Sequence, residues 1–178
     1  MKDKLKVVLC WHMHQPQYKD QLSGEYLLPW TYLHATKDYT DMAAHLEAID
    51  GAKAVVNFAP VLLDQIHDYA RQVRRFLQQG STIHDELLSV LAGDKPVPLS
   101  THARRSLIEA CTRANGEHMI APFEPLQQLV DLVALWQQQT DVAWAYLDES
   151  FITDLLVWYH LVWLGNSVHR NDQRVELL

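Results

Sequence analysis

Glycine and cysteine are both scarce in this sequence, which has six glycines and two cysteines among 178 residues. No G-x-x-x-x-G-K-[ST], G-x-G-x-x-G or G-x-S-x-G motif occurs, so a phosphate-binding loop, a dinucleotide fold and a nucleophile elbow are poorly supported. The two cysteines, Cys10 and Cys111, cannot build a disulfide framework. We expect Cys10 to be a small buried apolar residue, and we predict no cofactor.

Positive charge is also in short supply, with 15 Lys and Arg against 22 Asp and Glu and a formal net charge of −7. This balance argues against nucleic acid or an anionic membrane as a partner. No secretory signal is visible near Met1, and the most apolar late stretch, Leu155 to Leu164, is too short to span a bilayer. We therefore expect a cytoplasmic protein, and nothing in the sequence indicates an oligomeric state.

The most informative stretch is the apolar run Lys6 to Cys10, which is followed directly by Trp11-His12-Met13-His14-Gln15-Pro16. An apolar, β-favouring run of this kind is typical of a buried parallel strand. Pro16 ends the strand, because proline has no N–H to give to the sheet. His12 and His14 are two residues apart, so the pleat points them the same way, at the strand end where α/β proteins bind ligands.

The rest of the chain is predicted to be one βαβ unit followed by mostly helical sequence. A long aromatic loop from Gln17 to about Lys37 precedes a helix capped by Asp38, and a second strand places Asn57 on the same rim as the histidines. We expect strands near residues 5–11 and 53–58 and mainly helices from residue 61 onward. Two strands cannot form a stable parallel sheet, so the choice lies between an α-rich domain with a small sheet and the front part of a larger barrel.

The paired histidines allow two kinds of chemistry. Two imidazoles on one side of a strand are a common start to a zinc site in an amidohydrolase or deacetylase, which needs further ligands from later strands. Imidazole and carboxamide groups beside Trp and Tyr equally suit a subsite for a sugar or another polar ligand. A non-catalytic helical interaction domain with a structural histidine pair is the third alternative.

Acidic residues do not complete a catalytic site. Hydrolysis of a glycosidic bond needs two facing carboxyl groups about 5–9 Å apart. Asp148 and Glu149 are adjacent at a helix entry, and Asp38 and Asp41 are more readily explained as capping residues. We therefore predict no catalytic residue and no metal ligand in this chain.

Several motifs resemble family 57 of the glycoside hydrolases, the α-amylase and amylopullulanase-like group. His12-Met-His-Gln-Pro16 resembles the first sequence signature of that family, and Tyr26 to Tyr39 is similar to its Leu-Pro-Trp…His-Ala…Lys-Asp-Tyr stretch. Asn57 to Leu63 is similar to its second strand and following helix, and Phe151 to Asn171 resembles its helical insertion. The resemblance covers most of the chain and is most specific in the first sixty residues.

The resemblance implies an α/β fold in which residues 1–178 form the N-terminal portion of an incomplete (β/α)7 barrel with a helix-rich insertion. It implies a retaining α-glucan hydrolase or transglycosylase whose Glu nucleophile and Asp general acid lie on later strands, so this chain is expected to be an inactive fragment. The partner would be an α-glucan oligosaccharide or polysaccharide. By resemblance and local argument, the substrate-binding residues are His12, His14, Gln15, Trp30, His34, Lys37 and Asp38.

Overall fold

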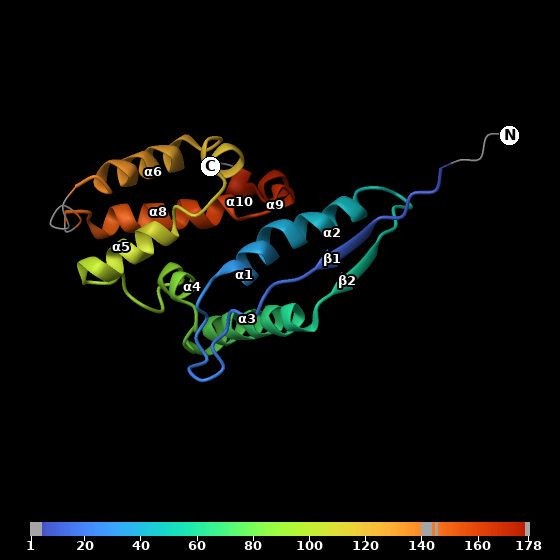
Figure 1. The fold of residues 1–178 in the computed structure, drawn as a ribbon, viewed down its shortest axis with the longest axis horizontal. Coiled ribbons are helices and arrows are strands. Elements are labelled where there is room, and N and C mark those ends of the chain that lie inside the picture. Colours follow the sequence, from blue (N-terminus) through green and yellow to red (C-terminus); the bar gives the residue numbers. More distant parts are fainter. Residues whose placement is uncertain (1–4, 140–143, 145, 177–178) are drawn as a thin grey trace.

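The protein is a helix-rich α/β structure with one small parallel sheet (Figure 1). The computed structural model describes residues 5–139, 144 and 146–176. The elements are β1 (Cys10–Met13), α1 (Trp30–His34), the π-helical turn η1 (Ala35–Tyr39), α2 (Thr40–Glu47), β2 (Val55–Phe58), α3 (Pro60–Gln79), α4 (Glu86–Leu91), α5 (Thr101–Ala110), the π-helical turn η2 (Gly116–Ile120), α6 (Glu124–Trp136), α8 (Glu149–Val162), α9 (Asn166–Asn171) and α10 (Gln173–Glu176). In the described part of the chain, no helix combines the length and apolar character needed to cross a membrane.

Strands β1 and β2 pair in parallel, as the predicted βαβ unit requires. The N–H of Val55 donates to the Leu9 carbonyl at 2.8 Å, and this bond opens the ladder. The predicted first strand over residues 5–11 is wrong in position, because β1 begins only at Cys10. The cause is the partner strand: β2 begins at Val55, so residues 5–8 have no strand beside them to pair with.

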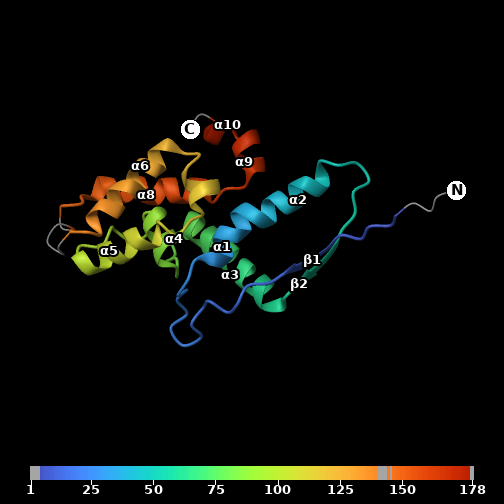
Figure 2. The same cartoon turned by 45° about the horizontal axis from the view of Figure 1, so that its top comes forward.

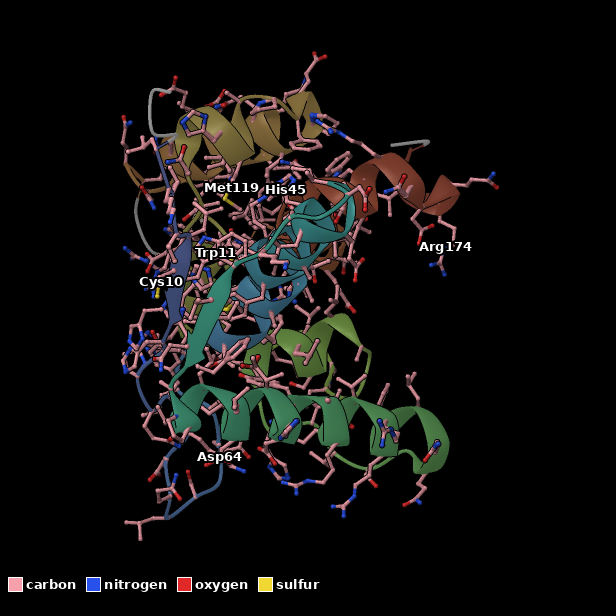
Figure 3. All side chains as sticks on the ribbon, turned by 90° about the vertical axis from the view of Figure 1, so that its right-hand side faces the viewer. Cys10, Trp11, His45, Asp64, Met119 and Arg174 are labelled. Carbon is pink, nitrogen blue, oxygen red and sulfur yellow. The ribbon has the colours of Figure 1, made fainter. Side chains whose placement is uncertain are left out.

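The two faces of the sheet have different surroundings. Helices α2 and α3 lie on the same side of the strands, and Trp11 points towards them while Cys10 lies on the opposite side (Figure 3). Met13, on the Trp11 face, is buried, whereas Cys10 and the whole of β2 are exposed. The expectations of a buried strand and a buried Cys10 are therefore wrong, because in the described part of the chain helices cover only the Trp11 side of β1 and leave β2 exposed.

A continuous helical segment runs from Trp30 to Glu47 through α1, η1 and α2. The expected loop up to Lys37 and the expected helix start at Asp38 are both wrong. The helix begins directly after Pro29 because its first turn buries Thr31, Tyr32 and Leu33 against the rest of the protein. Asp38 lies inside the segment, in helical backbone, and its carboxylate pairs with His34 one turn earlier instead of capping a helix end.

The main core lies among the later helices, with α8 at its centre (Figure 2). Helix α8 contacts α4, α5 and α6, and it buries one face through Ile152, Leu155, Leu156, Tyr159 and Val162. Ser100 caps α5, because its hydroxyl accepts a hydrogen bond from the Ala103 N–H at 3.2 Å. Helix α3 opens the helical part of the chain, where mainly helices were expected from residue 61 onward.

Asp41 and Gly165 join the N-terminal βαβ unit to this core. The Asp41 carboxylate accepts hydrogen bonds from the Asn166 N–H at 2.7 Å and from the Ser167 N–H and hydroxyl at 2.9 and 2.7 Å. Partial burial favours the neutral acid, but these donors outweigh burial and lower the pKa of Asp41. The Gly165 N–H donates to the Thr36 carbonyl of η1 at 3.0 Å, so the residue before α9 lies directly against the helical segment.

His160 is held in the same core as a neutral imidazole. Its Nδ1 lies 2.7 Å from the Leu156 carbonyl oxygen, which can only accept, so Nδ1 carries the proton. Its Nε2 lies 2.7 Å from the Tyr32 hydroxyl oxygen and accepts a hydrogen bond from that hydroxyl. Burial lowers the pKa of His160 to about 4, although the bond to Leu156 acts in the opposite direction.

Replacing Gly165 by alanine should lower the free energy of unfolding by about 1–3 kcal/mol, the usual cost of overpacking. A Cβ at this position would lie 2.6 Å from Asp41 Oδ1 and 3.1 Å from the Lys37 carbonyl oxygen. Urea unfolding followed by circular dichroism measures the effect. The control is Gly116→Ala, where a Cβ meets nothing within 4 Å; equal losses in the two variants would contradict the tight contact.

The stability that His160 contributes should depend on pH. Its folded pKa of about 4 lies below the unfolded value near 6.5, so the unfolded chain binds the proton first and stability falls as pH drops from 6.5 to 4. Between pH 7 and pH 5 the wild type should lose about 2 kcal/mol more than His160→Gln. Denaturant titrations at several pH values measure this difference, and His45→Gln, at an exposed position on α2, should leave the wild-type slope unchanged.

Candidate functional site

His12, His14 and Asn57 form a polar group on the uncovered face of the sheet. His12 lies opposite Asn57 in the strand register, and its Nδ1 is 2.7 Å from the Asn57 carboxamide oxygen. The rings of His12 and His14 stack with centroids 6.0 Å apart and planes 15° apart, so the two imidazoles point the same way as predicted. All three residues are exposed. Their hydrogen-bonding groups face solvent, and none of the three side chains belongs to the hydrophobic core.

Gln15 connects this polar group to the helical segment. Its carboxamide oxygen accepts from the Tyr18 hydroxyl at 2.9 Å, and its Nε2 donates to the Tyr39 hydroxyl at 3.3 Å. Both ends of the side chain are therefore occupied by the protein. Gln15 fixes the position of the turn after β1.

Trp30 and His34 form an aromatic group with Trp163, which follows α8. The Trp30 and Trp163 rings have centroids 5.8 Å apart, and His34 meets Trp163 edge-on at 5.2 Å. His34 also contacts the Tyr39 ring at 6.4 Å. The group therefore reaches towards Gln15 through Tyr39.

Lys37 and Asp38 lie on η1, beside this aromatic group. Asp38 forms an ion pair with the Nδ1 of His34. Lys37 is half-buried, and its positive charge is one of the influences that keep the pKa of Asp41 low. Both side chains thus interact with groups on the same helical segment.

The structure places the seven predicted binding residues in two groups linked by Gln15 and Tyr39. No hydrogen bond, ion pair or ring contact of the described residues joins His12 or His14 directly to the group around His34. The sequence did not point to Tyr39 or Trp163 as site residues. Tyr39 lies in the motif Lys37 to Tyr39 and could have been found there, whereas Trp163 is one of several aromatics on an apolar helix.

Two carboxylates on the helical segment beside the aromatic group are already engaged. Asp38 pairs with His34, and Asp41 receives the first N–H groups of α9. Further away, Asp68 accepts from Lys19 Nζ at 2.7 Å, and Asp85 accepts from the Tyr69 hydroxyl at 2.7 Å. No two of these form a free facing pair.

Metal binding finds no support in the same residues. Within the described ranges, no three His, Cys, Asp or Glu side chains lie together in a way that could hold a metal ion. Asn57, the partner of His12 Nδ1, offers a carboxamide oxygen, which is a weaker ligand for zinc than imidazole, thiolate or carboxylate.

Comparison with models of known protein families shows to which family this chain belongs. The model of glycosyl hydrolase family 57 matches residues 8–150, which include the histidine stretch, the aromatic segment and both strands. The chain belongs to glycosyl hydrolase family 57. No curated protein and no solved structure matches the chain. Family 57 membership confirms the resemblance seen in the motifs, and it supports a role in glycoside hydrolysis or transglycosylation with a carbohydrate substrate.

Substituting Asp38 distinguishes its observed role, an ion pair with His34, from the helix cap expected from the sequence. The His34 and Asp38 side chains are 31% and 45% exposed, so their pairing is weak and Asp38→Ala should change the free energy of unfolding by no more than about 0.5 kcal/mol. Loss of a helix N-cap would cost about 1 kcal/mol. Asp148→Ala is the matched control, because Asp148 does cap α8 through the Phe151 N–H at 2.8 Å.

Equal losses for Asp38→Ala and Asp148→Ala in the same denaturant titration would contradict the assignment of Asp38 to the helix interior.

Proposed function

We propose that this chain forms one wall of the substrate site of a retaining α-glucan hydrolase or transglycosylase. The observation that carries the proposal is the polar group of His12, His14 and Asn57 on the uncovered sheet face. Imidazole nitrogens and carboxamide groups can donate and accept hydrogen bonds, as recognition of sugar hydroxyls requires. Family 57 membership supports the carbohydrate as the ligand class.

The aromatic group supports the same interpretation. Trp30 is only half-buried and offers a flat apolar surface on which a sugar ring can stack, while the buried Trp163 ring packs against it and His34 contacts both rings and Tyr39. Trp30, His34, Lys37 and Asp38 would border the subsite, with the Gln15–Tyr39 bond holding this group beside the histidine stretch.

In the proposed mechanism, two carboxyl groups supplied by polypeptide outside this sequence act by double displacement through a glycosyl-enzyme. Placing the catalytic carboxyl groups outside this sequence is supported by the side chains of Asp38, Asp41, Asp68 and Asp85, each of which is bound to a partner within the protein. His12 and His14 would hold hydroxyl groups of the reacting sugar. Strand β2 is exposed along its whole length, Val55 and Phe58 included, and this is compatible with further strands of an incomplete (β/α)7 barrel beside it.

Binding of a maltooligosaccharide to this chain tests the proposal. Titration with maltoheptaose, followed by tryptophan fluorescence and by calorimetry, should show saturable binding. His12→Ala and His14→Ala should each weaken it by roughly fivefold, since one net hydrogen bond is worth about 1 kcal/mol. His45→Ala, at an exposed histidine on α2, is the matched control and should bind as the wild type does.

Cellohexaose serves as the ligand control because its glucose units have the opposite anomeric linkage. Equal binding of the two sugars, or binding that His12→Ala and His14→Ala leave unchanged, would contradict the proposed site. The same samples should release no reducing ends from maltoheptaose, and robust turnover would contradict the assignment of the catalytic carboxylates to other polypeptide.

A further inference from the structure

The hydrogen bond between His12 and Asn57 joins two residues that face each other across the parallel ladder. The Nδ1 to Oδ1 distance is 2.7 Å. Backbone hydrogen bonds on both sides hold the register: the Val55 N–H donates to the Leu9 carbonyl at 2.8 Å, and the Ala59 N–H to the Met13 carbonyl at 2.9 Å. The pairing of the two side chains is therefore set by the sheet, although both are exposed to water.

This contact decides which nitrogen of His12 carries the proton. A carboxamide oxygen can only accept, so Nδ1 must donate, and the neutral ring then has its lone pair on Nε2. A histidine side chain free in water prefers the opposite form, with the proton on Nε2. Asn57 thus works against the ordinary preference of the imidazole.

We propose that Asn57 is a positioning residue that holds His12 in the Nδ1–H form and so presents Nε2 as a hydrogen-bond acceptor. The identity of the donor, a hydroxyl group of an α-glucan, rests on the proposed function. The tautomer itself does not, because it follows from the contact between the two side chains.

The choice of asparagine fits this role better than the acid would. A carboxylate at the same place would favour the charged imidazolium, in which both nitrogens only donate. A neutral carboxamide orients the ring without adding a charge that favours the imidazolium, so the Nε2 lone pair of the Nδ1–H form can accept a hydrogen bond. His14 provides the contrast within the same stretch: its one described interaction is the ring contact with His12.

Long-range ¹H–¹⁵N correlation spectra of the histidine-labelled chain test the proposal at a pH where the imidazoles are neutral. In the wild type, His12 should be mainly Nδ1–H and His14 mainly Nε2–H. Asn57→Leu should lower the Nδ1–H to Nε2–H ratio of His12 by roughly fivefold, which corresponds to about 1 kcal/mol. Asn57→Asp should keep the Nδ1–H form, and Val55→Leu, on the same face of β2, should leave the ratio unchanged.

A wild-type His12 in the Nε2–H form would overturn the proposal, and this result does not depend on whether any variant folds. An Asn57→Leu spectrum that matches the wild type would also overturn it. Addition of maltotriose separates the two proposals: a shift of the His12 Nε2 resonance supports both. The expected tautomer without any response to sugar sustains the role of Asn57 and counts against the glucan site.

Discussion

The close approach of α2 to the start of α9 is the contact on which the helical side of this protein depends. Asp41 receives the first N–H groups of α9, and an anion at that place is favoured by the positive end of the helix dipole. Gly165 permits the approach, since any side chain there would collide with Asp41. The same contact places Trp163, two residues earlier, against Trp30 and His34. Stability and the shape of the aromatic group therefore have a common origin.

Much of the architecture could be predicted because the relevant signals are local. The spacing of apolar residues in α3 and α8 and the capping serine of α5 depend on neighbours in sequence, and the parallel pairing of the two strands follows from the helix that connects them. The start of α1 could not be predicted, because Thr31 and Leu33 are buried by segments distant in sequence. The position of β1 was missed for the same reason: it is set by where β2 begins, at Val55.

The candidate site likewise has some features that could be predicted from the sequence and others that could not. The common direction of His12 and His14 follows from the two-residue period of a strand, and Asn57 falls beside them because the strands are parallel. Trp163 joins the aromatic group only through folding, since it lies more than a hundred residues from Trp30. Asp38 illustrates the opposite error, in which a residue type that favours helix ends sits inside a helix and pairs with an imidazole.

The positions of His12, His14 and Asn57 are hard to explain by packing. Each is exposed, whereas Trp11 points to the other face (Figure 3), and Met13, two residues further along β1, is buried. Folding requires only that exposed strand residues favour extended backbone, for which threonine or valine would serve better than asparagine. Under the proposed function, this polar face, built from residues outside the core, binds sugar hydroxyl groups. On that proposal, the sheet separates two tasks, with packing on the helix-covered face and recognition on the uncovered one.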